Sequence, residues 1–228
     1  KYHYIHQLRI PIRQHHAVIY GHAVHQAIRV FHLNQLSGRE TPLRVLEAAF
    51  RKAWHAEGFL TRQHEELRLQ QGLQALRAFH AAETVSPSRP SHVEKRFSVP
   101  MGDVRLIGVF DRIDQADGDA VIIDYKTSEV TSDEQALQQV KGSRQMALYA
   151  LAFERLFSRL PAALELRFLT PDLFVGRTEP TRKRIEQAEE ELRRAAEGIR
   201  RGLFPASPAY QACTYCAYAF LCPDRRSS

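Results

Sequence analysis

The sequence has little cysteine, no long apolar run and no signal-peptide pattern at its start, and each absence excludes a class of protein. Only three of the 228 residues are cysteine, and all lie within the last sixteen, which argues against a disulfide framework. No apolar stretch is long enough to span a bilayer. The G-x-x-x-x-G-K-[ST] loop of nucleotide-driven motors does not occur either. We therefore expect a soluble, cytoplasmic protein that has no motor of its own and no membrane partner.

The sequence does contain enough apolar residues for a core, together with an excess of basic residues. Hydrophobic residues make up 44% of the chain and charged residues 25%, as is typical of globular proteins. The net charge of +6 favours a polyanionic partner, because Lys and Arg replace the counterions on phosphates. The first residue is Lys rather than Met, and we expect the chain to be a piece of a longer protein.

Apolar residues recur with helical spacing over five segments. The predicted helices cover residues 17–34, 42–55, 62–82, 133–157 and 180–201. Thr41 is expected to cap the second helix, with Pro42 in its first turn. Leu67 is expected to face the core from the third helix, and Ile199 from the last.

Alternating patterns predict four strands between these helices. They cover residues 93–99, 104–113, 120–126 and 164–169. Asp117 and Gly118 form a hairpin signal between the second and third strands. The order of elements indicates a single α/β domain over residues 1–228, with a helical insertion at 36–84 and a cysteine-containing segment at 203–228.

The predicted hairpin places two carboxylates face to face. If the turn is centred on Asp117 and Gly118, the numbers of facing residues sum to 235, so that Asp111 stands opposite Asp124. Lys126 lies two residues after Asp124 and shares its face of the strand. Facing carboxylates repel one another unless something compensates their charge. Mg²⁺ or Mn²⁺, which prefer oxygen ligands, would do so.

A simpler interpretation of the same residues is that both Asp side chains are solvated and that Lys126 forms an ordinary surface ion pair. The apolar strands around Asp111 and Asp124 favour the metal site instead. Arg112 and Asp114 are expected to be structural partners at the strand edge rather than catalytic groups.

Motifs along most of the chain resemble those of the PD-(D/E)XK nuclease superfamily, in its RecB-like branch. Asp111 together with Asp124, Tyr125 and Lys126 resembles the catalytic hairpin. Gly21 and His25 match the G-x-x-x-H motif, and Gln145 and Tyr149 match the Q-x-x-x-Y motif. Glu94 matches a glutamate on the strand before the hairpin.

The resemblance implies a restriction-endonuclease-like α/β core, in which helices flank a small mixed sheet, and Mg²⁺- or Mn²⁺-dependent hydrolysis of DNA. The metal ligands that it implies are His25, Asp111, Asp124 and a backbone carbonyl near Tyr125. Lys126 would position or activate water, and Gln145 and Tyr149 would contact Lys126 or the DNA backbone. His22, one turn before His25, is the alternative histidine ligand.

The three cysteines have C-x₂-C-x₅-C spacing, which suggests a shared metal site. In this chain the trio is Cys213, Cys216 and Cys222, and iron–sulfur members of the RecB-like branch have a similar C-terminal trio. The resemblance implies a [4Fe–4S] cluster whose fourth cysteine lies upstream of Lys1. Zinc completed by His3 or His6 is the alternative. Either site would join the two ends of the chain.

Residues 50–59 resemble part of the nuclease domain at the C-terminus of some UvrD-like helicases. This implies a helicase motor on the same polypeptide or on a partner, a role in bacterial DNA repair or recombination, and single-stranded DNA or DNA ends as substrate. A standalone CRISPR-adaptation nuclease and an inactive DNA-binding module are the alternatives. Basic residues of the 180–201 helix would guide the strand, although that helix also fits an ordinary solvated surface.

Overall fold

The computed structural model describes residues 2–11, 15–85, 90–116, 118–214 and 216–226. Their contacts divide the chain into two compact units. Unit 1 comprises Lys1–Gln14 and Glu190–Ser228, and unit 2 comprises His15–Glu189. Helix α6 (Arg182–Arg200) begins in unit 2 and ends in unit 1. The prediction of one domain with an insertion at residues 36–84 stays a prediction.

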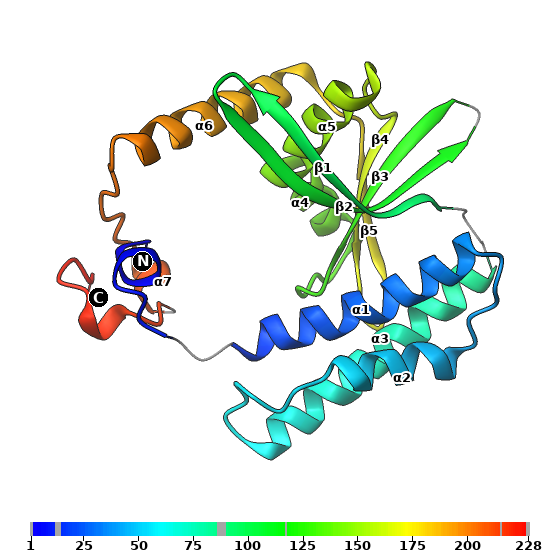
Figure 1. Cartoon of the computed structure of the whole chain (residues 1–228). Coiled ribbons are helices and arrows are strands. Elements are labelled where there is room, and N and C mark those ends of the chain that lie inside the picture. Colours follow the sequence, from blue (N-terminus) through cyan, green and yellow to red (C-terminus); the bar gives the residue numbers. More distant parts are fainter. Residues whose placement is uncertain (1, 12–14, 86–89, 117, 215, 227–228) are drawn as a thin grey trace. The chain divides into compact units, whose positions relative to one another are not determined.

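Unit 2 is built on a five-stranded mixed sheet (Figure 1). Its strands are β1 (Pro90–Met101), β2 (Val104–Ala116), β3 (Asp119–Lys126), β4 (Ala163–Phe168) and β5 (Phe174–Thr178). They lie side by side in sequence order, and only the β3–β4 pair is parallel. A parallel pair needs a crossover connection, which here contains two helices between β3 and β4.

Three helices form a layer against one face of this sheet (Figure 1). They are α1 (His16–Leu36), α2 (Leu43–Ala53) and α3 (Arg62–Val85). Their apolar faces form one core with Ile123 and Tyr125 of β3. The face of β3 that carries alternate apolar residues is therefore buried against helices, as the sequence pattern predicts.

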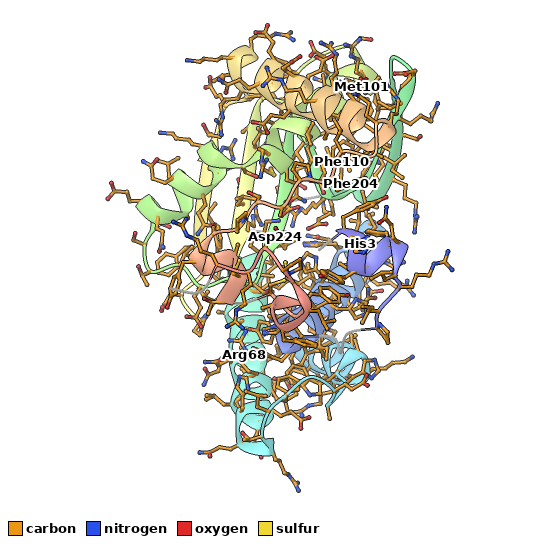
Figure 2. The ribbon with its side chains drawn as sticks, turned by 90° about the vertical axis from the view of Figure 1, so that its left-hand side faces the viewer. His3, Arg68, Met101, Phe110, Phe204 and Asp224 are labelled. Atoms are coloured by element: carbon orange, nitrogen blue, oxygen red, sulfur yellow. The ribbon has the colours of Figure 1, made fainter. Side chains whose placement is uncertain are left out.

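The crossover helices are α4 (Asp133–Gly142) and α5 (Arg144–Phe157). The ring of Tyr149 on α5 packs edge-on against Phe97 of β1 and Phe110 of β2. Phe110 is labelled in Figure 2. Helices thus flank the mixed sheet, which confirms the expected fold class.

The register of the β2–β3 hairpin agrees with the sequence prediction. Arg112 pairs with Ile123 and Ala116 with Asp119, so facing residues sum to 235. Gly118 has φ +89°, a conformation that glycine adopts without strain in a tight turn. Asp117, the other predicted turn residue, lies outside the described residues.

One secondary-structure prediction between residues 133 and 178 is wrong, and one strand there was not predicted. The predicted helix 133–157 is two helices, because Ser143 ends α4 and its hydroxyl accepts a hydrogen bond from the Met146 N–H at the start of α5. Strand β5 was not predicted, since it is only five residues long and has a glycine at its centre. A Cβ at Gly176 would lie 2.1 Å from the Ala136 carbonyl oxygen, so that glycine permits β5 to approach α4.

Three single-residue predictions are also wrong. The N-cap of α2 is Pro42 rather than Thr41, and no side chain caps that helix. Leu67 is 57% exposed and Ile199 is 58% exposed, so neither packs in a core. Both residues fit the helical period, but each lies on an exposed part of its helix.

Unit 1 brings the two ends of the chain together. It contains the single-turn helix η1 (His3–Gln7), α7 (Tyr210–Thr214) and η2 (Ala219–Leu221). The Tyr4 and Tyr218 rings stack with centroids 5.2 Å apart, and the Tyr4 hydroxyl donates to the Leu221 carbonyl oxygen at 2.7 Å. Within the described residues, no helix of either unit has the length and apolar character needed to cross a bilayer.

Candidate active site

Two carboxylates, one half-buried and one buried, lie just beyond the last residue pair of the β2–β3 ladder. The last pair of that ladder is Arg112 with Ile123, and the next residues along each strand are Asp111 and Asp124. The side chain of Asp111 is 17% exposed and that of Asp124 is 3% exposed. The predicted meeting of the two carboxylates is therefore consistent with the observed register.

The surroundings of Asp111 disfavour its negative charge. Burial, followed by the charge of Asp124, raises the pKa of Asp111 to about 6. The Tyr125 N–H partly offsets this, because it donates to Asp111 Oδ2 at 3.0 Å. Near neutral pH, the site thus holds two close negative charges whose repulsion is only partly compensated.

Asp124 has one satisfied oxygen and one that accepts no hydrogen bond. Its Oδ1 accepts from Gln145 Nε2 at 2.8 Å. Its Oδ2 is buried and lies 2.7 Å from Lys126 Nζ. The two groups form an ion pair, but Oδ2 accepts no hydrogen bond. The structure thus places Lys126 beside Asp124, as the D-x-K spacing predicts.

Gln145 and Tyr149 link this pair to the sheet. Lys126 Nζ donates to Gln145 Oε1 at 2.7 Å. Gln145 Nε2 also lies 2.9 Å from the Tyr149 hydroxyl, which in turn donates to the Val109 carbonyl oxygen at 2.7 Å. Burial, followed by the charge of Asp124, raises the pKa of Tyr149, so that its hydroxyl stays protonated and able to donate. Gln145 therefore fixes both Lys126 and Asp124.

His25 approaches the carboxylates from α1. Its Nδ1 lies 3.6 Å from Asp111 Oδ2, whereas the alternative, His22, is exposed. Gly21 allows this approach, because a Cβ there would lie only 3.2 Å from the Thr127 hydroxyl oxygen, one residue beyond β3. The G-x-x-x-H spacing thus has a physical basis: the glycine brings the helix close to the strand end, and the histidine follows one turn later.

Glu94 adds a third carboxylate on the neighbouring strand. It lies between the pairs Val93–Arg112 and Lys95–Phe110, and is therefore level with Asp111. Its charge contributes to the raised pKa of Asp111. Glu94 has φ +52°, a left-handed conformation that is costly for a residue with a side chain and that is often found at functional sites.

A known protein family matches almost the whole chain. The sequence model described as the PD-(D/E)XK nuclease superfamily matches residues 1–223. The chain belongs to the PD-(D/E)XK nuclease superfamily. Nucleases of this superfamily generally use Mg²⁺ or Mn²⁺.

Among solved structures, this PD-(D/E)XK chain is similar to the crystal structure of SSO0001, with 15% identity and a TM-score of 0.45. The alignment covers 98% of this chain and 94% of that one. No curated protein sequence matches.

The carboxylates of this PD-(D/E)XK chain fit a divalent cation. Asp124 Oδ2 is buried without a hydrogen bond, and Asp111 carries a charge that its surroundings disfavour. A cation would relieve both penalties. Among the residues that the structure describes, no three His, Cys, Asp or Glu side chains lie close enough together to hold a metal ion by themselves. An ion here would need water or backbone oxygens as well, which is usual for Mg²⁺.

The cysteine segment of the PD-(D/E)XK chain lies in unit 1. Cys213, Cys216 and Cys222 are free and half-buried. Among the described residues, these cysteines form no metal-binding group with His3 or His6. The contacts that join the chain ends there are aromatic stacking and hydrogen bonds, such as that from the Tyr218 hydroxyl to the Ile10 carbonyl oxygen. The structure gives the predicted [4Fe–4S] cluster no support, and it stays a prediction, as does zinc.

Sequence analysis missed a buried charge network behind the site. The predicted partnership of Arg112 with Asp114 is present, as two hydrogen bonds of 2.6 and 2.8 Å, but it is not at an edge, because Arg112 is fully buried and β2 is an inner strand. Its Nη1 also lies 3.3 Å from Glu83 and 3.2 Å from the Tyr125 hydroxyl, which lies 2.7 Å from His32 Nε2. Burial, followed by the charge of Arg112, lowers the pKa of His32 to about 3, so His32 is neutral there. The network fixes the ring of Tyr125, whose N–H binds Asp111.

Proposed function

We propose that the chain hydrolyses phosphodiester bonds of DNA, using a divalent cation held by Asp111 and Asp124. The observation that carries this proposal is the buried Asp124 oxygen that accepts no hydrogen bond. It lies beside Lys126 and near Asp111, a carboxylate whose negative charge is disfavoured by its surroundings. A structural ion pair would not need the second carboxylate. Family membership favours the same conclusion, because PD-(D/E)XK proteins are generally nucleases.

Each side chain has a role in this proposal. Asp111 and Asp124 bind the cation, together with His25 and a backbone carbonyl near Tyr125. A bound Mg²⁺ or Mn²⁺ ion supplies Lewis-acid stabilisation of the charge that develops on the phosphate oxygens. Lys126 orients the attacking water and stabilises the same charge. Gln145 acts on Lys126 rather than on the phosphate, because it accepts a hydrogen bond from the ammonium group, and Tyr149 acts through its hydrogen bond with Gln145.

The test is cleavage of end-labelled DNA, single-stranded and duplex, by the purified chain with Mg²⁺, with Mn²⁺ or with EDTA. We expect cleavage with either metal and none with EDTA, because the carboxylates alone cannot stabilise the phosphate charge. DNA that binds but is never cleaved would instead support the alternative, a DNA-binding module with a degraded site.

We further propose that the chain belongs to the RecB-like branch and acts within a bacterial helicase–nuclease in DNA repair or recombination, with the motor on the same polypeptide or on a partner. The residues that support this are the G-x-x-x-H and Q-x-x-x-Y motifs and the resemblance of residues 50–59. The alternative is a standalone CRISPR-adaptation nuclease. The gene product that contains this sequence distinguishes them, because a Walker motif on the same chain favours the helicase fusion.

A further inference from the structure

The backbone of Tyr125 contacts strand β2 at the proposed metal site. The paired part of β2 and β3 ends before this residue, and the Tyr125 N–H donates to the Asp111 carboxylate at 3.0 Å. The carbonyl oxygen of the next residue, Lys126, accepts from the Leu169 N–H on the opposite side, beyond the end of β4. Successive residues of a strand point their polar backbone groups to opposite sides, so the Tyr125 carbonyl faces the side of Asp111. The position of the Tyr125 backbone therefore affects both Asp111 and the carbonyl oxygen proposed as a metal ligand.

A buried chain of hydrogen bonds holds the other end of Tyr125, its phenol group. The hydroxyl oxygen lies 2.7 Å from His32 Nε2 and 3.2 Å from Arg112 Nη1. The other ring nitrogen of His32, Nδ1, lies 3.0 Å from the amide oxygen of Gln35. The side chains of Tyr125, His32 and Arg112 are all buried, so bulk water does not compete for the bonds among them.

The direction of each bond in this chain follows from its two ends. Arginine can only donate, and an amide oxygen can only accept. The lowered pKa of His32 leaves its imidazole neutral, and its one ring proton lies on Nδ1, which faces the Gln35 oxygen. Nε2 therefore carries no proton and accepts from the Tyr125 O–H, while the same hydroxyl oxygen accepts from Arg112. The chain has one donor for each acceptor, and removal of any member leaves a buried group unsatisfied.

Packing alone does not account for this chain. The rings of His32 and Tyr125 already stack, with centroids 5.7 Å apart, and both also pack edge-on against Phe79. Apolar side chains would fill the same space, and they would not need hydrogen-bond partners in the protein interior. What the polar groups add is a fixed position for the Tyr125 hydroxyl, at the end of the strand that carries the proposed metal site.

We propose that His32 is a positioning residue for the metal site: its hydrogen bond with the Tyr125 hydroxyl holds the Tyr125 backbone where Asp111 and the cation need it. His32 acts through Tyr125 and binds no metal itself. This inference rests on the proposed function for the presence of the cation. The tautomer that it requires, with the proton of His32 on Nδ1, needs neither metal nor DNA.

The experiment is a titration of Mn²⁺ into the metal-free protein and its variants. Tyr125→Phe and His32→Leu should each weaken Mn²⁺ binding roughly three- to tenfold, the effect expected from one lost hydrogen bond. Both changes together should weaken it no more than one alone, because they remove the same bond. His32→Gln should recover most of the affinity lost in His32→Leu, since its amide oxygen can accept from the Tyr125 hydroxyl.

Tyr218→Phe is the matched control. Tyr218 is also buried, and its hydroxyl also donates a hydrogen bond, to the Ile10 carbonyl oxygen at 3.0 Å, but it belongs to unit 1. Its loss should leave Mn²⁺ affinity equal to that of the parent chain. The unfolding temperature of every variant, measured alongside, separates a loss of metal binding from a loss of folding.

Nitrogen-15 NMR of the histidine rings measures the tautomer in the metal-free protein, and the signals missing from His32→Gln identify those of His32. We expect the proton on Nδ1. A proton on Nε2 overturns the inference whatever the metal titration gives.

The inference also falls if the parent chain binds Mn²⁺ and both Tyr125→Phe and His32→Leu bind it as tightly as the control. In that case the proposed function stands without a role for His32. A parent chain that binds no Mn²⁺ removes the proposed function, and the positioning role with it.

Discussion

Asp124→Asn is expected to lower the rate of metal-dependent DNA cleavage roughly a thousandfold, which corresponds to about 4 kcal/mol of lost transition-state stabilisation. Asparagine keeps the shape and the oxygen that accepts from Gln145. It removes the negative charge that pairs with Lys126 and that would hold the proposed cation. The rate is measured on end-labelled DNA at saturating substrate.

Loss of folding would not explain this result. Because the charge of Asp124 contributes to the raised pKa of Asp111, its removal relieves repulsion in the metal-free protein. We therefore expect Asp124→Asn to unfold at no lower temperature than the parent chain. Asp119→Asn, the same change at the exposed start of β3, is the control and should cleave normally. Cleavage by Asp124→Asn within tenfold of that control would remove the proposed role of Asp124.

Arg112→Met is expected to lower the free energy of unfolding by about 3–5 kcal/mol, the usual cost of removing one partner from a buried ion pair. Arg112 is fully buried and binds Asp114 and Glu83. Without it, Glu83 retains its 2.6 Å contact with Arg167, but Asp114 loses both of its hydrogen bonds to Arg112. Methionine has a similar volume, so the lost free energy of unfolding comes from the missing charge and hydrogen bonds and not from a cavity.

Urea denaturation measures this effect, and Arg182→Met provides the comparison. Arg182 also makes two hydrogen bonds to a carboxylate, that of Glu154, but its side chain is 61% exposed. Water screens and replaces such a pair, so its removal should cost far less. If both variants lose the same free energy of unfolding, the Arg112 network contributes no more to stability than a surface ion pair does.

The parts of the fold that follow from local chemistry were predictable. The hairpin register follows from a turn at Gly118 and a strict two-residue alternation, and it is confirmed over five residue pairs. The break at Ser143 had a signal in the sequence, because Gly142 is followed by an N-cap residue within a polar stretch, but the prediction of one helix passed over it. Strand β5 was not predictable from periodicity, because it is short and Gly176 matters only through its contact with α4.

The candidate site was predictable where its residues lie on one hairpin or one helix turn. Asp111, Asp124 and Lys126 follow from register, and Gln145 and Tyr149 from four-residue spacing on α5. The buried network was not predictable, because Glu83 and Arg112 are 29 residues apart and charged residues are usually exposed. The left-handed backbone of Glu94 likewise has no signal in the sequence.

The central claim is that Asp111 and Asp124 together hold one divalent cation, and a titration of Mn²⁺ into the metal-free protein tests it most directly. Bound Mn²⁺ is measured at pH 7.5 and pH 5.5 for the parent chain, Asp124→Asn and Asp119→Asn. Because the pKa of Asp111 is raised to about 6, a proton competes with the ion below that pH, and the affinity should fall as the pH is lowered. We predict a site in the parent chain and in Asp119→Asn that weakens at pH 5.5 and is lost, or weakened at least about tenfold, in Asp124→Asn. Equal Mn²⁺ affinity in all three proteins would contradict the account.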